Sequence, residues 1–154
     1  MKPIEKKEEL LISVEKPLME EQFNAIFKVR QEVFVFEQNV DPSKEYDEFE
    51  STSTHFLAKV NDLPAGTARW RFTDKGIKLE RFAVLKAMRG QGVGQSLVKA
   101  VLDDIAAQPE SRGKKLYLHA QLDAIPLYTK FGFRKTGEMF EECKIEHFKM
   151  ELYL

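Results

Sequence analysis

The chain has 154 residues, the length of one domain, and its 43% apolar and 32% charged residues exclude wholesale disorder. The 24 basic and 25 acidic residues give a net charge of −1, which argues against nucleic acid as the partner, since proteins that track phosphate backbones are usually much more basic. The single cysteine, Cys143, excludes an internal disulfide, and three scattered histidines lack metal-ligand spacing, so we expect no metal site. No apolar run approaches the roughly 20 residues that span a bilayer, and residues 1–9 resemble a charged, frayed tail and not a signal peptide. We therefore expect a cytoplasmic protein with no membrane partner.

The first third of the chain predicts a strand, a helix and a loop. Leu10–Val14 predicts a short strand, and apolar side chains at helical spacing predict a helix from Leu18 to about Val35. The segment Glu37–Ser53 is polar and acidic and contains Pro42, so we expect a loop there with at most a helical turn.

The middle of the chain changes to the period of strands. Thr54–Val60, Ala65–Thr73 and Ile77–Leu85 predict three strands, separated by turn signals at Asn61–Pro64 and Asp74–Gly76. Short turns between successive strands predict an antiparallel meander.

The second half alternates helices and strands. The clearest helix is Gly92–Ala107, in which apolar residues recur every four positions. A short helix at Asp123–Phe131 carries Pro126 in its first turn, where a missing N–H costs little. Three further strands are predicted at Lys115–Ala120, Phe133–Phe140 and Ile145–Leu152. The element order predicts a mixed α+β fold, and no linker or repeat divides residues 1–154 into more than one domain.

Three of the eight glycines lie in the segment Arg89–Gly94 (RGQGVG), where a strand ends and the clearest helix begins. Glycine permits positive φ, and the first N–H groups of a helix lack intrahelical partners and carry partial positive charge. The segment therefore predicts a phosphate site, with Arg89 adding positive charge at its mouth. Its spacing fits neither the dinucleotide-binding G-x-G-x-x-G pattern nor the P-loop. A glycine-rich turn that caps the helix without a ligand is the alternative.

The same segment fits the pattern R/Q-x-x-G-x-G/A, and here the sequence resembles the GNAT superfamily of acetyl-CoA-dependent N-acetyltransferases. Residues 79–84 (LERFAV) resemble the family's fourth strand, and residues 124–133 (AIPLYTKFGF) resemble its A-x-x-x-Y-x-x-x-G-F signature. Residues 30–38 (RQEVFVFEQ) and 141–147 (EECKIEH) are similar to segments of the ElaA-like branch. The resemblance covers nearly the whole chain after residue 9. It implies the GNAT fold, a mixed, mostly antiparallel sheet of about seven strands flanked by helices.

The resemblance also implies that acetyl-CoA is the cofactor. In the family, backbone groups of the fourth strand hold the pantetheine arm, and the amides of the glycine segment hold the pyrophosphate. The cofactor-binding residues that it implies here are Phe82, Ala83, Val84, Arg89, Gly90, Gln91, Gly92, Val93, Gly94, Gln95, Gln121 and Tyr128. Gln121 stands where many members have Asn, so its contact departs from the family pattern.

The implied reaction is attack of a neutral primary amine on the thioester. This chemistry needs a base for the amine, fixed donors for the oxyanion and a proton donor for the leaving thiolate. Tyr128 aligns with the family tyrosine that acts as the general acid, and the Val84 N–H is the expected donor to the thioester carbonyl. A core tyrosine with a satisfied hydroxyl is the alternative for Tyr128.

Glu80 is the expected general base, since several family members keep a glutamate on this strand. Strand alternation predicts that Phe82 and Val84 share its face and that it points toward the central cleft, where burial near aromatic rings raises its pKa. An exposed acid, or a salt bridge with Arg69 or Arg71, is the alternative. The other candidate bases are His119, Glu142 and His147.

The acceptor pocket is expected between the first helix, its following loop and the meander. The residues expected to line it are Arg30, Phe34, Glu37, Gln38 and Trp70. Acids at Glu37, Asp47 and Glu48 favour a cationic amine, whereas Arg30 and Arg71 favour an acceptor that carries a carboxylate or phosphate. An ordinary solvated loop is the alternative for the acidic run.

These residues and the resemblance together imply acetyl transfer to a small-molecule primary amine by direct attack in a ternary complex. Acetylation of a protein or peptide amine is one alternative, and a non-catalytic CoA-binding module is another. Dimers are common in the family, so the resemblance is compatible with a homodimer.

Overall fold

The computed structural model describes residues 10–154, so the predicted tail at residues 1–9 lies outside the described residues. The strands are β1 (Ile12–Glu15), β2 (Thr54–Val60), β3 (Leu63–Thr73), β4 (Gly76–Val84), β5 (Lys115–Gln121), β6 (Arg134–Glu142) and β7 (Ile145–Tyr153). The helices are α1 (Glu20–Arg30), a π-helix (Gln31–Glu37), α2 (Pro42–Glu45), α3 (Val93–Ala106) and α4 (Ile125–Lys130), with 3₁₀ turns at Lys86–Met88, Pro109–Ser111 and Leu122–Ala124. No helix in this part of the chain is long and apolar enough to cross a membrane.

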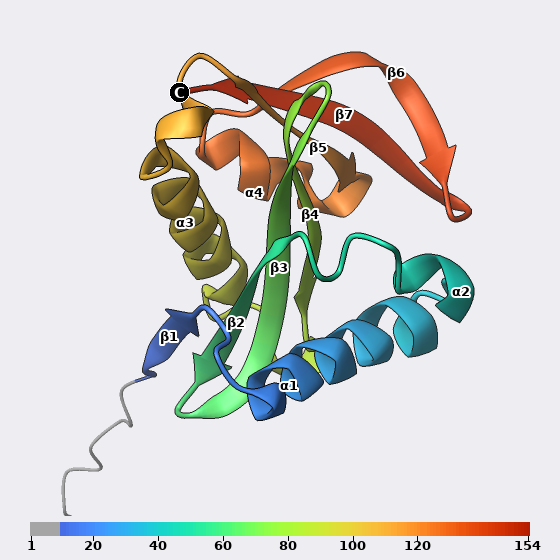
Figure 1. Cartoon of the computed structure of the whole chain (residues 1–154). Helices are drawn as coiled ribbons and strands as arrows, with labels where there is room; N and C mark the ends of the chain where they lie inside the picture. The colour runs from blue at the N-terminus through green and yellow to red at the C-terminus, as the bar shows by residue number, and fades with distance from the viewer. Residues whose placement is uncertain (1–9) are drawn as a thin grey trace, which may run out of the picture.

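The strands form one sheet in the order β1-β2-β3-β4-β5-β7-β6 (Figure 1). Neighbouring strands are antiparallel, with the exception of β4 and β5, which are parallel. The turn between β2 and β3 is made by Asn61 and Asp62, whose φ values of 48° and 67° suit a tight hairpin. The prediction of a mixed, mostly antiparallel sheet flanked by helices is confirmed.

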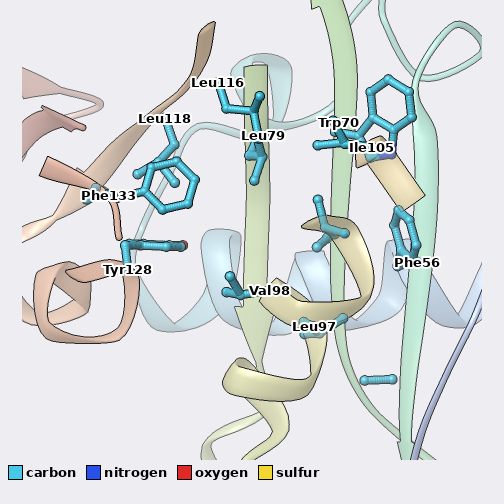
Figure 2. Packing of buried hydrophobic residues seen from close by; sticks show 14 of the residues in the cluster. Phe56, Trp70, Leu79, Leu97, Val98, Ile105, Leu116, Leu118, Tyr128 and Phe133 are labelled. Carbon is cyan, nitrogen blue, oxygen red and sulfur yellow. The ribbon is translucent and has the colours of Figure 1, made fainter. Parts of the chain in front are cut away.

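Helices cover the two faces of the sheet. On one face, α3 packs a buried apolar stripe against β2, β3 and β4, and Figure 2 shows Leu97, Val98 and Ile105 of this helix among the buried residues of the core. On the other face, α1 and the π-helix cover β3 and β4, where Val29 belongs to a smaller apolar cluster with Ala83. The half of the sheet formed by β5, β7 and β6 extends beyond α1 (Figure 1).

The first helix differs from the continuous helix expected between Leu18 and Val35. It begins at Glu20. The side-chain oxygen of Gln22 accepts hydrogen bonds from the backbone N–H groups of Leu18 and Met19, which precede the helix. After Arg30 the backbone widens into the π-helix, and the Gln38 N–H donates to the carbonyl of Val33, five residues back. Single π-turns inside helices often mark functional positions, and this one faces β4.

β4 contains a bulge that the sequence pattern does not reveal. Thr67 of β3 lies opposite Ala83, but Arg69 lies opposite Glu80, so two residues of β4 face one residue of β3. Arg81 adopts a φ of 59° at this point. A bulge adds one residue to the strand and reverses the alternation of faces beyond it.

Candidate active site

A groove opens where β4 and β5 separate. The two parallel strands pair only at Ile77–Leu116 and Lys78–Tyr117, after which they diverge. The Leu85 N–H donates to the Ala65 carbonyl on the β3 side at 2.8 Å. Because backbone groups alternate sides along a strand, those of Phe82 and Val84 face away from β3, toward the gap. The fold thus leaves main-chain groups of a central strand available to a ligand.

The outer part of the groove is a cleft of about 880 Å³ over the glycine segment. Eleven of the twelve residues expected to bind the cofactor line it, namely Phe82, Ala83, Val84, Arg89, Gly90, Gly92, Val93, Gly94, Gln95, Gln121 and Tyr128. Gln91 is the exception, and its side-chain oxygen is buried without a hydrogen-bond partner in the described residues. The sequence pattern therefore locates one wall of a continuous cleft.

The glycine segment has the geometry of an anion cradle. Gly90 and Gly92 have φ values of 78° and 93°, and a side chain added at Gly90 would meet nothing within 4 Å. The Ser96 N–H makes the first helical bond of α3 to the Gly92 carbonyl, which leaves the preceding amides without helical acceptors. These amides and the helix dipole suit a pyrophosphate group.

Arg89 lies at the mouth of this cleft and pairs with Glu37 of the π-helix. Its two terminal nitrogens donate to the two carboxylate oxygens at 2.6 and 2.5 Å, and its Nε donates to the Val84 carbonyl at 3.1 Å. The hydrogen bond from Arg89 lowers the pKa of Glu37. Glu37 was expected in the acceptor pocket, but it faces the outer cleft beside the glycine segment.

The inner part of the groove is a pocket of about 200 Å³ between β4, β5 and the β6–β7 hairpin. Phe34 and Gln38 line it as expected, and so do the candidate bases. Gln38 also reaches across the groove to Gln121, whose Nε2 donates to the Gln38 side-chain oxygen at 2.9 Å. This amide pair borders both parts of the groove, which makes one continuous site of them.

Tyr128 lines both parts of the groove. Its ring is held edge-on by Phe82, with ring centroids 5.6 Å apart, and by Phe133 at 6.1 Å. Figure 2 shows Tyr128 beside Phe133. The hydroxyl makes no hydrogen bond to the residues that the structure describes. Burial, and secondarily the charge of Asp123, raises the pKa of Tyr128 above its ordinary value. The side chain therefore rests as a protonated donor at the junction of cleft and pocket.

The structure contradicts the expected environment of Glu80. The bulge at Arg81 puts Phe82 and Val84 with the apolar cluster on the α3 side, whereas Glu80 pairs with cations beneath α1 and the loop after it. Its carboxylate accepts hydrogen bonds from Arg69 at 2.8 Å and Arg71 at 2.7 Å. Burial acts to raise the pKa of Glu80, but these two arginines outweigh it, and the pKa lies below its ordinary value.

Two residues expected in the acceptor pocket lie elsewhere. Arg30 is 1% exposed and donates to Glu45 at 2.5 Å and to Glu50 at 2.7 and 2.8 Å. Trp70 faces the α3 side of β3 at 4% exposure, where its Nε1 donates to Asp104 at 2.9 Å. Both side chains satisfy their polar groups inside the protein, so neither is available to an acceptor.

Sequence reasoning missed Lys78 and Arg81, which line the inner pocket. Strand alternation could have found Lys78, two residues before Glu80 on the same face. Arg81 owes its place to the bulge, for which the sequence carries no signal. In residues 10–154, no three His, Cys, Asp or Glu side chains come together to hold a metal ion.

A buried ion network fixes the loop that borders the inner pocket. Arg69 is 0% exposed, and its guanidinium pairs with Asp47 and Glu50 at 2.6 Å each and with Glu80 at 2.8 Å. Burial acts to raise the pKa of Asp47, but hydrogen bonds from Arg69 and the Phe49 N–H outweigh it and bring the pKa to about 2. The acidic run expected to be a solvated loop is thus partly tied to the sheet.

Stability should fall in acid because of this network. A carboxyl whose pKa is lowered by folding contributes stability above its unfolded pKa of about 3.9, and this contribution is lost as the pH falls toward the folded value. Asp47, Glu50 and Glu80 all have lowered pKa values. We expect the melting temperature to drop between about pH 5 and pH 2 in a thermal unfolding series. A melting temperature that stays constant over this range would contradict the expectation.

Comparison with known proteins agrees with the geometry. A family model described as "Acetyltransferase (GNAT) domain" matches residues 20–154. The uncharacterized N-acetyltransferase YjcF of Bacillus subtilis (strain 168) is 43% identical over 132 residues, which cover 85% of this chain and 92% of that protein. The crystal structure of Escherichia coli ElaA has a TM-score of 0.75 at 29% identity, covering 92% of this chain and 99% of that one.

A further solved structure shows the same fold at lower identity. It is a GNAT family acetyltransferase from Elizabethkingia anophelis, crystallised with acetyl-CoA bound, with a TM-score of 0.69 and 21% identity over 93% of this chain and 98% of that one. The family match spans most of the described residues, and YjcF is similar over nearly its whole length. The chain therefore belongs to the GNAT family of N-acetyltransferases.

Proposed function

We propose that the protein transfers the acetyl group of acetyl-CoA to the primary amine of a small molecule by direct attack in a ternary complex. The observation that carries the proposal is the two-part groove, with Tyr128 at the junction of an outer cleft and an inner pocket. One part suits a long anionic donor, and the other suits a compact acceptor.

The outer cleft fits the donor. Phe82 and Val84 turn main-chain groups toward the gap, so the pantetheine arm can pair with β4 as an added strand would. The amides around Gly92 and the guanidinium of Arg89 supply the positive field for the pyrophosphate. The Elizabethkingia anophelis relative, which has the same fold, binds acetyl-CoA.

The groove offers a group for two demands of the reaction, the oxyanion donor and the acid for the leaving thiolate. The Val84 N–H faces the gap and is the proposed donor to the thioester carbonyl oxygen. Tyr128 holds its proton because of its raised pKa, and we propose that it protonates the leaving thiolate. Acetyl-CoA supplies the activated acyl group when it is bound.

The inner pocket favours a small molecule over a protein as the acceptor. Its volume of about 200 Å³ suits a compact amine, and side chains from four strands and from several helical segments line it. Acetylation of a protein terminus or lysine would want a more open groove for the flanking residues.

The test is a thermal-shift series with acetyl-CoA, CoA and NAD, followed by thiol release with tyramine, spermidine, glucosamine and lysine. We expect stabilisation by both CoA species and thiol release with at least one amine. Absence of stabilisation by either CoA species would refute the donor site, and binding without thiol release would favour a non-catalytic module.

Gly92→Val should weaken acetyl-CoA binding by about 10–100-fold. Valine at a φ of 93° strains the backbone by roughly 1–3 kcal/mol. If the loop moves to relieve this strain, its amides no longer point at the pyrophosphate, and the affinity falls by a corresponding factor. Isothermal titration calorimetry measures the change. Gly113→Val is the matched control, since Gly113 also has positive φ, at 75°, with nothing within 4 Å of an added side chain, but lies outside the groove. Equal affinity losses in both variants would argue against the cradle.

A further inference from the structure

The inner pocket contains a histidine held by a carboxylate, and the inference drawn from it rests on the proposed function. His119 lies on β5, and its Nδ1 is 2.9 Å from Oε2 of Glu142 at the end of β6. Both residues line the inner pocket. The edge of the His119 ring also packs against Phe140, with centroids 5.0 Å apart and planes at 81°. Two side chains of β6 therefore fix the imidazole that β5 supplies.

The hydrogen-bond chemistry of the pair defines the tautomer of His119. The hydrogen bond from His119 lowers the pKa of Glu142, so this carboxylate is ionised at neutral pH and can only accept. Nδ1 must therefore carry the proton that it donates, and Nε2 of the neutral ring keeps a lone pair. Among the described residues Nε2 has no hydrogen-bond partner, and it is not among the buried polar atoms that lack one. The lone pair is thus accessible from the pocket.

Two other candidate bases face this part of the pocket, and neither is held by a carboxylate as His119 is. Glu80 of β4 accepts from two arginines and lies 3.5 Å from the Lys78 ammonium. His147 of β7 is 7% exposed, with its Nδ1 2.6 Å from the Ile145 carbonyl.

Two further neighbours of His119 come from β5 and β7. Tyr117 of β5 has its hydroxyl 2.7 Å from Thr73, and Lys149 of β7 pairs with Glu151 at 3.2 Å. Neither of them offers a free base to the pocket. His119 alone among these described groups combines a carboxylate partner with an accessible lone pair.

We propose that His119 is the catalytic base that deprotonates the acceptor ammonium and that Glu142 is its positioning residue. Nε2 takes one proton from the ammonium, and the nitrogen lone pair that this releases forms the C–N bond to the thioester carbonyl carbon. The C–S bond breaks, and its electron pair stays on sulfur. Tyr128 gives its proton to the leaving thiolate. The second proton that the nitrogen loses passes through solvent to the Tyr128 oxygen, which restores the phenol, and His119 returns its own proton to solvent. Glu142 stabilises the imidazolium in between, as a carboxylate does for a histidine base elsewhere.

The first test replaces the base and then supplies it from solution. With the amine that gives the highest wild-type rate, His119→Ala should lower kcat/KM by about 10²–10⁴-fold, and imidazole in the assay buffer should restore part of the rate. Acetyl-CoA affinity should stay unchanged, as measured by calorimetry. His147→Ala is the comparison variant, and imidazole should restore nothing to it because its ring is not the base.

The second test addresses the positioning role. Glu142→Gln should lower kcat/KM and move the acid limb of the pH–rate profile to lower pH, because the neutral amide no longer favours the charged imidazole. Glu142→Asp should recover much of the rate, whereas a residue that merely supports the fold would leave the profile in place. An unmoved acid limb in Glu142→Gln would overturn the positioning role.

The outcomes separate this inference from the proposed function. Wild-type protein that releases thiol, together with an unimpaired His119→Ala variant, would overturn the base assignment alone. Loss of activity in His119→Ala without rescue by imidazole would also overturn it. Wild-type protein that releases no thiol with any amine of the panel would overturn the proposed function, and the base assignment with it.

Discussion

Replacing Tyr128 by Phe is expected to lower kcat by about 10²–10⁴-fold, the range for loss of a general acid, with little change in acetyl-CoA affinity. The hydroxyl makes no hydrogen bond to the described residues, so removing it costs no bond in the resting fold. Phe keeps the edge-on contacts with Phe82 and Phe133. The variant should therefore fold and bind as the wild type does, and lose only the proton that the thiolate needs. Steady-state thiol release and calorimetry with acetyl-CoA measure the two effects separately.

Tyr117→Phe is the matched control for this experiment. Tyr117 is equally buried at 6% exposure, but its hydroxyl lies 2.7 Å from Thr73 and outside the groove. The control should lose roughly 1 kcal/mol of unfolding free energy, as for an ordinary hydrogen bond, and keep its kcat. Tyr128→Phe should thus lower kcat without lowering stability, whereas Tyr117→Phe should lower stability without lowering kcat. A Tyr128→Phe variant with wild-type kcat would remove Tyr128 as the acid.

Local patterns in the sequence were sufficient to predict the fold and one wall of the site. The meander follows from strand alternation and two short turns, and α3 follows from apolar residues at every fourth position. The glycine segment lies where it was expected because a strand end, a glycine turn and a helix start are consecutive along the chain. Short-range patterns of this kind hold whatever the rest of the molecule does.

The acceptor side of the groove could not be predicted in the same way. Alternation placed Glu80 beside Phe82, but a single added residue at the Arg81 bulge separates their faces. Trp70 was placed in the pocket, although nothing in β3 alone tells which face α3 covers. Arg30 pairs with acids fifteen and twenty residues later, in a loop without periodicity. Each error arises from contacts between segments distant in sequence.

Arg69→Met is expected to destabilise the protein by about 3–5 kcal/mol at pH 7, the cost of breaking a buried ion pair by removing one partner. Asp47, Glu50 and Glu80 would remain as neighbouring carboxylates without the cation that joins them. Their pKa values should rise in the variant, so the deficit against wild type should shrink as the pH is lowered and these acids take up protons. Urea unfolding at pH 7 and at about pH 4 measures both effects.

A surface pair provides the control for this prediction and shows what the network does for the site. Lys99 and Asp103 form an exposed ion pair on α3, with 70% and 67% of their side chains accessible, so Lys99→Met should change unfolding very little. If Arg69→Met and Lys99→Met lost the same free energy of unfolding, a special role for the buried network would be contradicted. Because Glu80 and the loop after α1 border the inner pocket, loosening them in Arg69→Met should raise the acceptor KM while leaving acetyl-CoA affinity intact. Arg69, which pairs with Glu80 and helps to lower its pKa, thereby also shapes the pocket in which His119 is proposed to act.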